Sequence, residues 1–230
     1  MKKENIVIYE PESKIKKFFI DVLDIIAFVI FIIGVFIFLK VFVVAVVNVD
    51  GESMLPNYKN GEFIMLDKVS RKLWGDIKRA DVVVAMPPTS NVSYLKRIIG
   101  LPGETVEITG GKVYICKTKQ EWEKYQWTDV RENKKFKDKN LVCKQLIEPY
   151  IEGKTVNKRW FEEKIVTEAK CEVNKFKLYS GQYLVLGDDR MYSLDSRCCF
   201  MWTCKWNAKY YLTKDEILGK IIDFKKLFWK

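Results

Sequence analysis

The chain contains no histidine in its 230 residues. This absence excludes imidazole as the general base of a serine or cysteine hydrolase and as a zinc ligand. None of the six cysteines stands in a C-x-x-C pair, the spacing typical of structural zinc sites. We therefore expect no metal and no cofactor, and any hydrolytic chemistry needs a base other than histidine.

Glycine and proline are not enriched, and the sequence has no internal repeat and no low-complexity tract. Hydrophobic residues make up 48% and aromatic residues 14%, which excludes a largely disordered chain and suffices for one compact domain with appendages. The even cysteine count allows disulfides if the domain lies outside the cytoplasm. Buried or free thiols are the alternative, because the sequence alone cannot pair the cysteines.

The formal net charge is +10. A basic excess is typical of nucleic-acid-binding proteins, but no recognisable nucleic-acid-binding module is present. Attraction to the anionic surface of a membrane explains the charge more simply. We therefore expect membrane lipid, and not nucleic acid, as a partner.

One long hydrophobic run lies near the N-terminus. Fifteen uncharged residues extend from Ile25 to Leu39, and the range 18–40 supplies the roughly 20 residues that cross about 30 Å of hydrocarbon. A cleaved signal peptide is the alternative, but its apolar core is shorter and ends in a small-x-small site, which Ala45-Val46-Val47 does not provide. The run therefore predicts a retained transmembrane helix over residues 18–40.

The lysines around this run predict its orientation. Five lysines precede it, whereas the first 20 residues after Lys40 contain only Lys59. The positive-inside rule places such a lysine-rich flank in the cytoplasm. We therefore expect a single-pass protein of the cell membrane, with residues 1–17 in the cytoplasm and everything after the span outside.

Short β-branched and aromatic segments separated by turn residues follow the span. Val41–Val49 predicts a strand that delivers Ser53 at its end. Thr213 and Glu216 have the spacing of a helix-capping box, and 221–224 is a candidate closing strand. Turn residues separate the other strand candidates, which are 63–66, 82–86, 95–99, 105–108, 113–116 and 183–186. So many short strands predict a mainly β domain of barrel or sandwich-like form.

Residues 117–180 differ in composition from the rest, being rich in lysine and glutamate. Four aromatic residues that need burial are interspersed: Trp122, Trp127, Trp160 and Phe161. The segment therefore predicts an inserted cap subdomain and not a linker. Residues 41–116 and 181–230 would together form the catalytic β domain.

Ser53 and Lys96 are the candidate catalytic residues. A serine nucleophile needs a base, and without histidine a lysine with a lowered pKa can serve. Lys96 is near apolar Leu95 and Ile98, a setting that can lower its pKa by the roughly 2–3 units needed near neutral pH. Each residue also has an ordinary interpretation: Ser53 as a turn former close to Pro56, and Lys96 on the solvated face of a strand.

Three motifs stand in order behind the span. They read V-D-G-E-S-M-L-P at 49–56, Y-L-K-R-I-I-G-L-P-G-E at 94–104 and G-D-D-R-M-Y-S-L-D-S-R at 187–197. The first alone is weak, but the three together make the chain resemble the bacterial type I signal peptidases, over residues 18–110 and 182–224. The resemblance implies an all-β catalytic domain of signal-peptidase type, a Ser/Lys dyad and no cofactor.

By this resemblance Ser53 would be the nucleophile, with its backbone N–H as an oxyanion donor, and Lys96 the general base. Ser193 would hydrogen-bond the Lys96 amine and fix its rotamer. Gly51 takes a place where some members have a serine that donates to the oxyanion, so a second side-chain donor is absent. Losing one such donor typically costs about 10²–10³ in rate.

Other motif residues would bind substrate or hold the site together. Four charged residues would form ion pairs that hold the last motif against the strand of Lys96: Arg97, Asp188, Asp195 and Arg197. Three residues would shape pockets for small substrate side chains: Met54, Tyr94 and Leu95. An extended substrate would add as a strand to the edge formed by Val82, Val83, Val84 and Ala85. The sequence departs from the family pattern at Asn57, Asp189 and Cys198-Cys199-Phe200, and none of these changes removes the dyad.

These features predict a membrane-anchored serine endopeptidase that removes N-terminal signal peptides from translocated precursors after small residues. Signal peptides are then its partners, and the secretion translocon or pilus subunits are further candidates. One alternative is a signal-peptidase-like protein dedicated to pilus or surface-protein assembly, with restricted or no proteolytic activity; the retained Ser53 and Lys96 argue against it. A Ser/Lys self-cleaving repressor shares the dyad type but is soluble and carries a DNA-binding region, so the span disfavours it.

Overall fold

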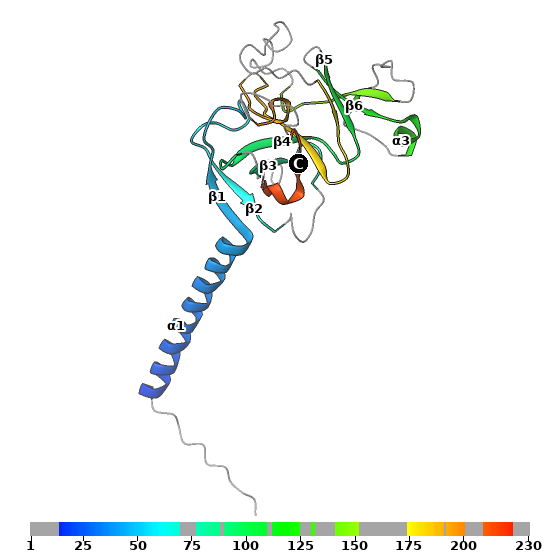
Figure 1. Ribbon diagram of the computed structural model, residues 1–230. Helices are drawn as coiled ribbons and strands as arrows, with labels where there is room; N and C mark the ends of the chain where they lie inside the picture. Colours follow the sequence, from blue (N-terminus) through cyan, green and yellow to red (C-terminus); the bar gives the residue numbers. More distant parts are fainter. Residues whose placement is uncertain are drawn as a thin grey trace, which may run out of the picture. The chain divides into compact units, whose positions relative to one another are not determined.

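The computed structural model describes residues 14–69, 77–87, 90–109, 112–124, 130–131, 141–151, 174–190, 192–200 and 209–222. The chain divides after Val43 into two units. The first unit contains one long helix, and the second contains the strands (Figure 1). Each unit is described by itself.

The first unit is helix α1, Lys14–Phe38, followed by one π-helical turn, η1, Leu39–Val43. None of the residues of α1 is buried by the rest of the protein. At about 1.5 Å per residue, the 25 residues of α1 extend about 37 Å, more than the roughly 30 Å of a bilayer core. The predicted helix over 18–40 is therefore confirmed as a helix long and apolar enough to cross a membrane.

The expected strand 41–49 begins later than the sequence indicates. Its first three residues belong to the π-helical turn, and β1 covers only Val44–Asn48. In the register with β2, Val44 faces Asp67, the last residue of that strand. A β-branched segment becomes a strand only where a partner completes its backbone hydrogen bonds, so the helical hydrogen-bond pattern continues up to this point.

The larger sheet has seven strands, in the order β1-β2-β12-β3-β4-β10-β11. Each pairing between neighbours is antiparallel. The strands are β1, β2 Phe63–Asp67, β3 Val82–Ala85, β4 Tyr94–Gly100, β10 Gln182–Leu186, β11 Leu212–Thr213 and β12 Ile217–Ile221.

The second sheet has five strands, in the order β7-β8-β6-β5-β9. They are β5 Thr105–Thr109, β6 Lys112–Lys117, β7 Val130–Arg131, β8 Val142–Leu146 and β9 Lys175–Lys177. The short helical elements are α3 Lys119–Lys124, η3 Ser196–Cys198 and η4 Lys214–Glu216. The predicted mainly β fold behind one N-terminal apolar helix is therefore confirmed, and each of the six short strands expected between 63 and 186 is present within one residue of its expected ends.

The C-terminal part of the larger sheet differs from the prediction. The capping box forms, with Glu216 Oε2 accepting a 2.8 Å hydrogen bond from the Thr213 N–H, but it closes only the three-residue 3₁₀ turn η4. The chain then enters β12 at Ile217. This strand lies between β2 and β3 in the sheet, and its alternate residues are buried. The closing strand expected at 221–224 therefore begins earlier, as β12 Ile217–Ile221, and residues 223–224 lie outside the described residues.

The segment 117–180 shares a sheet with the strands before it. Its strand β8 pairs with β6, and its strand β9 pairs with β5. Trp122 of α3 is buried, and its Nε1–H donates a 2.6 Å hydrogen bond to the carbonyl of Val142 in β8. The other three aromatic residues expected to anchor this segment lie outside the described residues, and the domain division at 117 and 180 stays a prediction.

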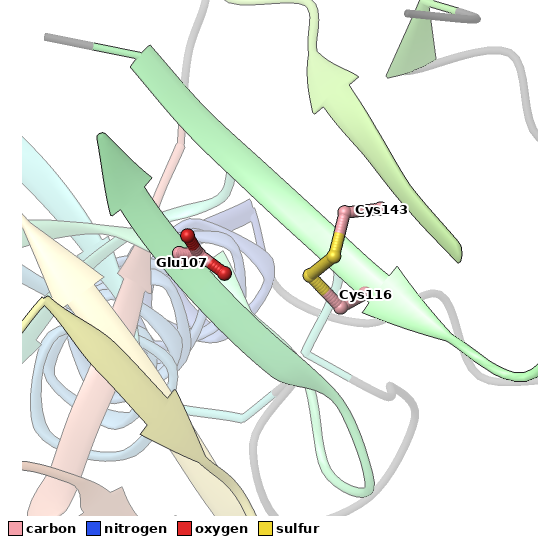
Figure 2. A group of neighbouring side chains, drawn as sticks. All are labelled: Glu107, Cys116 and Cys143. Atoms are coloured by element: carbon pink, nitrogen blue, oxygen red, sulfur yellow. A yellow bond between two sulfur atoms is a disulfide. The ribbon is translucent and has the colours of Figure 1, made fainter. Parts of the chain in front are cut away.

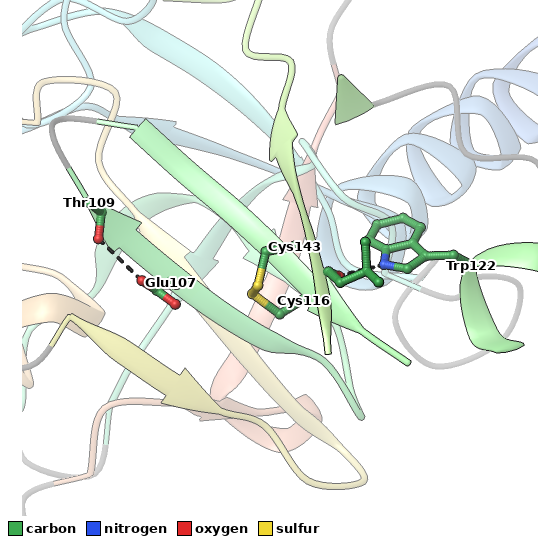
Figure 3. Close-up of a disulfide and its surroundings, with 6 residues drawn as sticks. Glu107, Thr109, Cys116, Trp122 and Cys143 are labelled. Atoms are coloured by element: carbon green, nitrogen blue, oxygen red, sulfur yellow. Dashed lines mark hydrogen bonds between the residues drawn. A yellow bond between two sulfur atoms is a disulfide. The ribbon is translucent and has the colours of Figure 1, made fainter. Parts of the chain in front are cut away.

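A disulfide joins the two sheet neighbours β6 and β8. Cys116 and Cys143 face each other in the strand register and are bonded through their sulfurs (Figure 2). Figure 3 shows the bridge together with Trp122, which packs beside the same pair of strands. Cys198 and Cys199 each take part in a disulfide as well. Of the two alternatives for the cysteines, the structure therefore has disulfides at each cysteine that it describes.

Buried clusters connect the sheets and support the turn after β1. One cluster joins Ile99 and Leu184 of the larger sheet to Val106 and Phe176 of the smaller sheet. Another contains Met54, which is 1% exposed, together with apolar residues of β2, β3 and β12. Because Met54 directly follows Ser53, its burial fixes the position of the serine backbone against the sheet.

Candidate active site

Ser53 lies in the turn between β1 and β2 and is half-buried. Backbone hydrogen bonds close the turn around it, from the Leu55 N–H to the Glu52 carbonyl and from the Asn57 N–H to the Met54 carbonyl. Gly51 has a φ of +99°, a left-handed conformation that favours glycine. The tight turn therefore holds Ser53 at the surface while the next side chain enters the core.

Lys96 is in β4, opposite Val83 of β3, and is 1% exposed. Its Nζ lies 2.7 Å from Ser53 Oγ and 3.0 Å from the carbonyl oxygen of Leu95, to which it donates. The same nitrogen lies 5.4 Å from the ring centroid of Tyr94. Two residues that are 43 positions apart in the sequence thus meet within hydrogen-bonding distance, as a hydroxyl and a buried amine.

Burial lowers the pKa of Lys96 to about 8. Removal from water disfavours the charged ammonium and is the largest cause; Arg197 acts in the same direction, whereas Asp195 and Asp188 oppose it. None of the ion pairs among the described residues includes Lys96. A lysine in this setting has a substantial neutral fraction near neutral pH and can act as a base, whereas an exposed lysine is almost entirely protonated.

Ser193 does not make the hydrogen bond to Lys96 that the resemblance implies. Its Oγ is buried and has no hydrogen-bond partner in the part of the chain that the structure describes. A Cβ atom on Gly187 would lie 2.1 Å from this oxygen and 2.5 Å from the Ser53 carbonyl oxygen, so Ser193 packs against Gly187 beside the Ser53 backbone. The Lys96 amine is instead directed at Ser53 and at the Leu95 carbonyl.

The four charged residues expected to form ion pairs make two such pairs. Arg97 donates from Nε and Nη2 to the two carboxylate oxygens of Asp188, at 2.7 and 2.5 Å. Arg197 donates in the same two-point manner to Asp195, at 2.9 and 2.8 Å. Burial opposes both charges, but the partners prevail: Asp188 raises the pKa of Arg97, and Arg197 lowers that of Asp195.

Only the first of these pairs joins two elements. Arg97 belongs to β4, whereas Asp188 follows β10, so this bond fastens the last motif beside Lys96. The second pair stays within the last motif, where Asp195 also accepts a 3.0 Å hydrogen bond from the Gly187 N–H. It therefore shapes the loop and does not attach it to the strand of Lys96.

The expected substrate edge at Val82–Ala85 is wrong. These residues form β3, which pairs with β12 on one side and with β4 on the other, and all four are buried. A strand with two neighbours has no free backbone groups for a third. The sequence could not show this, because β12 comes from a segment more than 130 residues later in the chain.

Among the described residues, a stretch of strand with a neighbour on one side only lies instead in β4 itself. Its pairing with β10 ends at Arg97, opposite Leu186, whereas its pairing with β3 continues to Tyr94. Tyr94 and Leu95 are half-buried there. Met54, expected to shape a pocket with them, is almost completely buried in the core.

One possible oxyanion donor is already occupied. The backbone N–H of Gly51 donates a 3.0 Å hydrogen bond to the side-chain oxygen of Asn60. The backbone N–H of Ser53 makes no hydrogen bond within the described part of the chain. The second of these groups, and not the first, is therefore available to a ligand.

The structure also places a polar group near the site that the sequence interpretation missed. Glu148 and Tyr150 follow β8, in the segment 117–180. Glu148 contacts Arg190 of the loop after β10, whereas Tyr150 contacts Glu148 and Arg97. The only sequence signal is Arg190, a cation of the motif at 187–197 for which the sequence indicates no acidic partner. Because the partner is 42 residues away in the sequence, spacing could not identify it.

One group of side chains has the composition of a metal site. Ligand atoms of Glu107, Cys116 and Cys143 lie within 4.8 Å of one another (Figure 2). The two sulfurs are bonded to each other, however, so neither is a thiolate that could bind a cation. The carboxylate of Glu107 accepts a hydrogen bond from Thr109 (Figure 3).

Comparison with known proteins identifies the family of the chain. The family model described as signal peptidase, peptidase S26, matches residues 22–223. The chain therefore belongs to the signal peptidase family, a family of peptidases. The apolar helix α1 is consistent with membrane anchoring, as expected for a protein of this family.

Individual relatives carry the same description. Signal peptidase IB of Staphylococcus aureus (strain COL) is 33% identical over 197 residues, which are 85% of this chain and 82% of the relative. Signal peptidase I U of Bacillus subtilis (strain 168) is 30% identical over 210 residues, 91% of this chain and 87% of the relative. A solved signal peptidase I from Enterococcus faecalis is 22% identical, covers 64% of this chain and 98% of its own, and has a TM-score of 0.38. The family model and the two relatives from Staphylococcus aureus and Bacillus subtilis show the family.

Proposed function

We propose that this protein is a membrane-anchored serine endopeptidase that removes N-terminal signal peptides from translocated precursors, with Ser53 as nucleophile and Lys96 as general base. The observation that carries the proposal is the 2.7 Å contact between Ser53 Oγ and the buried Lys96 Nζ, in a chain without histidine. The family membership supports signal peptides as the substrate class.

The proposed reaction has two halves. Neutral Lys96 takes the proton of the Ser53 hydroxyl while Oγ attacks the scissile carbonyl, and Lys96 then returns this proton to the leaving amine of the mature protein. In the second half, Lys96 removes a proton from a water that attacks the acyl carbon of the acyl-enzyme. Lys96 returns this proton to Ser53 Oγ as the ester bond breaks, and the signal peptide leaves with a C-terminal carboxylate. The free Ser53 N–H supports its assignment as a donor to the oxyanion in both halves.

The substrate is proposed to bind as an extended strand on β4. Residues Tyr94 and Leu95 have no β10 partner, and they lead directly to Lys96. A peptide paired with this stretch would bring a carbonyl to Ser53. The packed core beneath the site, where Met54 and Lys96 are each 1% exposed, supports a preference for small side chains before the cut.

Ser193 is proposed as a positioning residue for the dyad. Its buried Oγ has no partner among the described residues and lies beside the Ser53 backbone. A buried hydroxyl without a partner is costly, and a shift of the Lys96 amine during proton transfer would provide one.

The orientation proposed for the chain follows the lysine distribution, with residues 1–17 in the cytoplasm and the strands outside. The disulfide between β6 and β8 supports an oxidising compartment for the second unit. Signal peptides reach that side of the membrane during translocation, where the dyad would meet them.

The test uses the full chain in detergent with a precursor that carries a signal peptide. We expect Ser53→Ala, Lys96→Ala and Lys96→Arg each to abolish cleavage, because guanidinium stays protonated and cannot act as the base. Lys220→Arg is the matched control, since Lys220 lies on β12 in a partly exposed pair with Asp81, and it should cleave at the wild-type rate. Cleavage by any of the three dyad variants would refute the assignment, and an inactive wild type would favour the assembly factor without proteolytic activity.

A further inference from the structure

The loop Gly187–Arg190 holds the backbone of the proposed nucleophile. The Asp189 N–H donates a 3.0 Å hydrogen bond to the Ser53 carbonyl oxygen. All four residues of the loop are buried. The position of Ser53 relative to Lys96 therefore depends on where this loop is held.

Glu148 holds the loop through Arg190. Its two carboxylate oxygens accept hydrogen bonds from Nη1 and Nη2 of the Arg190 guanidinium, and the Glu148–Arg190 ion pair is almost fully buried. The third guanidinium nitrogen, Nε, donates a 3.0 Å hydrogen bond to the Gly187 carbonyl. Arg190 thus ties both ends of its own loop to one carboxylate of the segment 117–180.

Tyr150 makes three contacts to the same region. Its hydroxyl donates a 2.8 Å hydrogen bond to Glu148, and its ring centroid lies 4.1 Å from the Arg97 guanidinium carbon. Its backbone carbonyl accepts a 2.9 Å hydrogen bond from Asn57, in the turn that contains Ser53. The second hydrogen of the same Asn57 amide goes to Asp188, at 2.7 Å.

We propose that Glu148 and Tyr150 are positioning residues of the peptidase, which hold the Ser53 turn and the loop Gly187–Arg190 in register beside Lys96. This inference rests on the proposed function of Ser53 and Lys96. It extends the active-site support to a segment outside the three motifs. The segment 117–180 would then be part of the catalytic apparatus and not only a cap.

The charge of Arg190 and the hydroxyl proton of Tyr150, on which the contacts with Glu148 depend, are both retained. Arg190 is buried, and although burial opposes its charge, Glu148 raises its pKa, so the guanidinium stays charged. Burial and Glu148 also raise the pKa of Tyr150 well above its usual range, so its hydroxyl remains a donor. Removing the carboxylate would leave a buried cation without its partner, which is strongly unfavourable. The loop would then move to hydrate Arg190 and carry the Asp189 N–H away from Ser53.

Two variants test the proposal in the full-length protein. Glu148→Gln removes the charge, and Tyr150→Phe removes only the hydroxyl while keeping the ring on Arg97. We expect kcat to fall about 10- to 100-fold for Glu148→Gln and less for Tyr150→Phe, since small misplacement of reacting groups has effects of this size. KM should stay within about twofold, because substrate contacts on β4 are unchanged.

Glu104→Gln is the matched control. Glu104 is buried and ion-paired with Arg79 and Lys117, but none of its contacts reaches Ser53 or the loop Gly187–Arg190. It should lower Tm as much as Glu148→Gln does while leaving kcat within about twofold of wild type below Tm. This outcome would separate positioning from general loss of stability.

The results that overturn the inference are specific. If kcat of the Glu148 and Tyr150 variants equals that of the control at matched distance below Tm, both residues are only structural. If Glu148→Gln does not fold, Tyr150→Phe is the deciding variant, since it removes a single oxygen. An unchanged kcat for Tyr150→Phe would then refute the positioning role of Glu148 and Tyr150. Failure of the wild type to cleave would instead refute the proposed function.

Discussion

Lys96 and Arg97 are consecutive buried residues of β4, but only Arg97 has a carboxylate partner within the described part of the chain. Alternation along a strand directs neighbouring side chains to opposite faces. Arg97 therefore meets Asp188, and Lys96 meets Ser53. Burial of Arg97 is compensated by its ion pair with Asp188, so Arg97 stays charged and has a structural role. Burial of Lys96 has no such compensation among the described residues and lowers its pKa, so Lys96 can act as a base.

The first prediction concerns pH. Because only neutral Lys96 accepts a proton and its pKa is lowered to about 8, kcat/KM should rise about tenfold per pH unit below 8 and level off above it. The measurement is a pH–rate profile of the full chain with a precursor substrate. An inflection near the pKa of an exposed lysine would exclude Lys96 as the base.

The second prediction is that Lys96→Met stabilises the protein. The pKa falls from 10.5 to about 8, so the unfolded chain binds the proton more tightly, and burial of the ammonium costs about 3 kcal/mol below pH 8. This cost decreases as pH rises from 8 towards 10.5. Urea unfolding of wild type and variant should therefore show a larger gain in free energy of unfolding at pH 7 than at pH 10. An equal gain in free energy of unfolding at pH 7 and pH 10 would contradict the lowered pKa of Lys96.

The third prediction compares a buried ion pair with an exposed one. Asp188→Asn should cost about 3–5 kcal/mol, because it leaves Arg97 buried without a counter-charge. Asp81→Asn breaks the pair with Lys220, whose side chain is 42% exposed, and should cost about 1 kcal/mol or less. Chemical unfolding of both variants measures the difference, and equal losses would show that the Arg97 pair is not desolvated.

The fourth prediction concerns the residue before the cut. The proposed site lies over a packed core, with Met54 and Lys96 each 1% exposed, so a large side chain would have to displace buried groups. Two precursors that differ only in alanine or phenylalanine at this position should differ by about 100-fold or more in kcat/KM. Comparable rates would argue for an open site.

The fifth prediction is the topology. A protease cleavage site inserted near residue 130 should be cut by protease added outside intact, wall-stripped cells, whereas a site within residues 1–13 should be protected. The reason is the group of five lysines that precedes the apolar run beginning at residue 18. The reverse pattern would place Ser53 on the wrong side of the membrane for translocated precursors.

Much of the strand content could be predicted because it depends on local patterns. The segments 105–108 and 113–116 contain β-branched residues between turn signals, 63–66 is a short apolar run, and each is a strand. Residues 41–43 are also β-branched or aromatic, yet they are helical, and β12 begins four residues before the strand expected at 221. Strand boundaries depend on where a partner strand lies, which no local window contains.

The sequence by itself determined the classes of chemistry: no imidazole base, one apolar span, and a serine and a lysine within motifs of a peptidase family. These follow from composition and from short spacings along the chain. Only the tertiary structure decided the rest: the 2.7 Å approach of Lys96 to Ser53, the burial of β3 between two neighbours, and the contacts of Glu148 with Arg190 and of Tyr150 with Glu148 and Arg97. Burial and pKa are properties of the atoms packed around a group. Here those atoms come from segments that are 40 to 130 residues apart in the sequence, and folding alone brings them together.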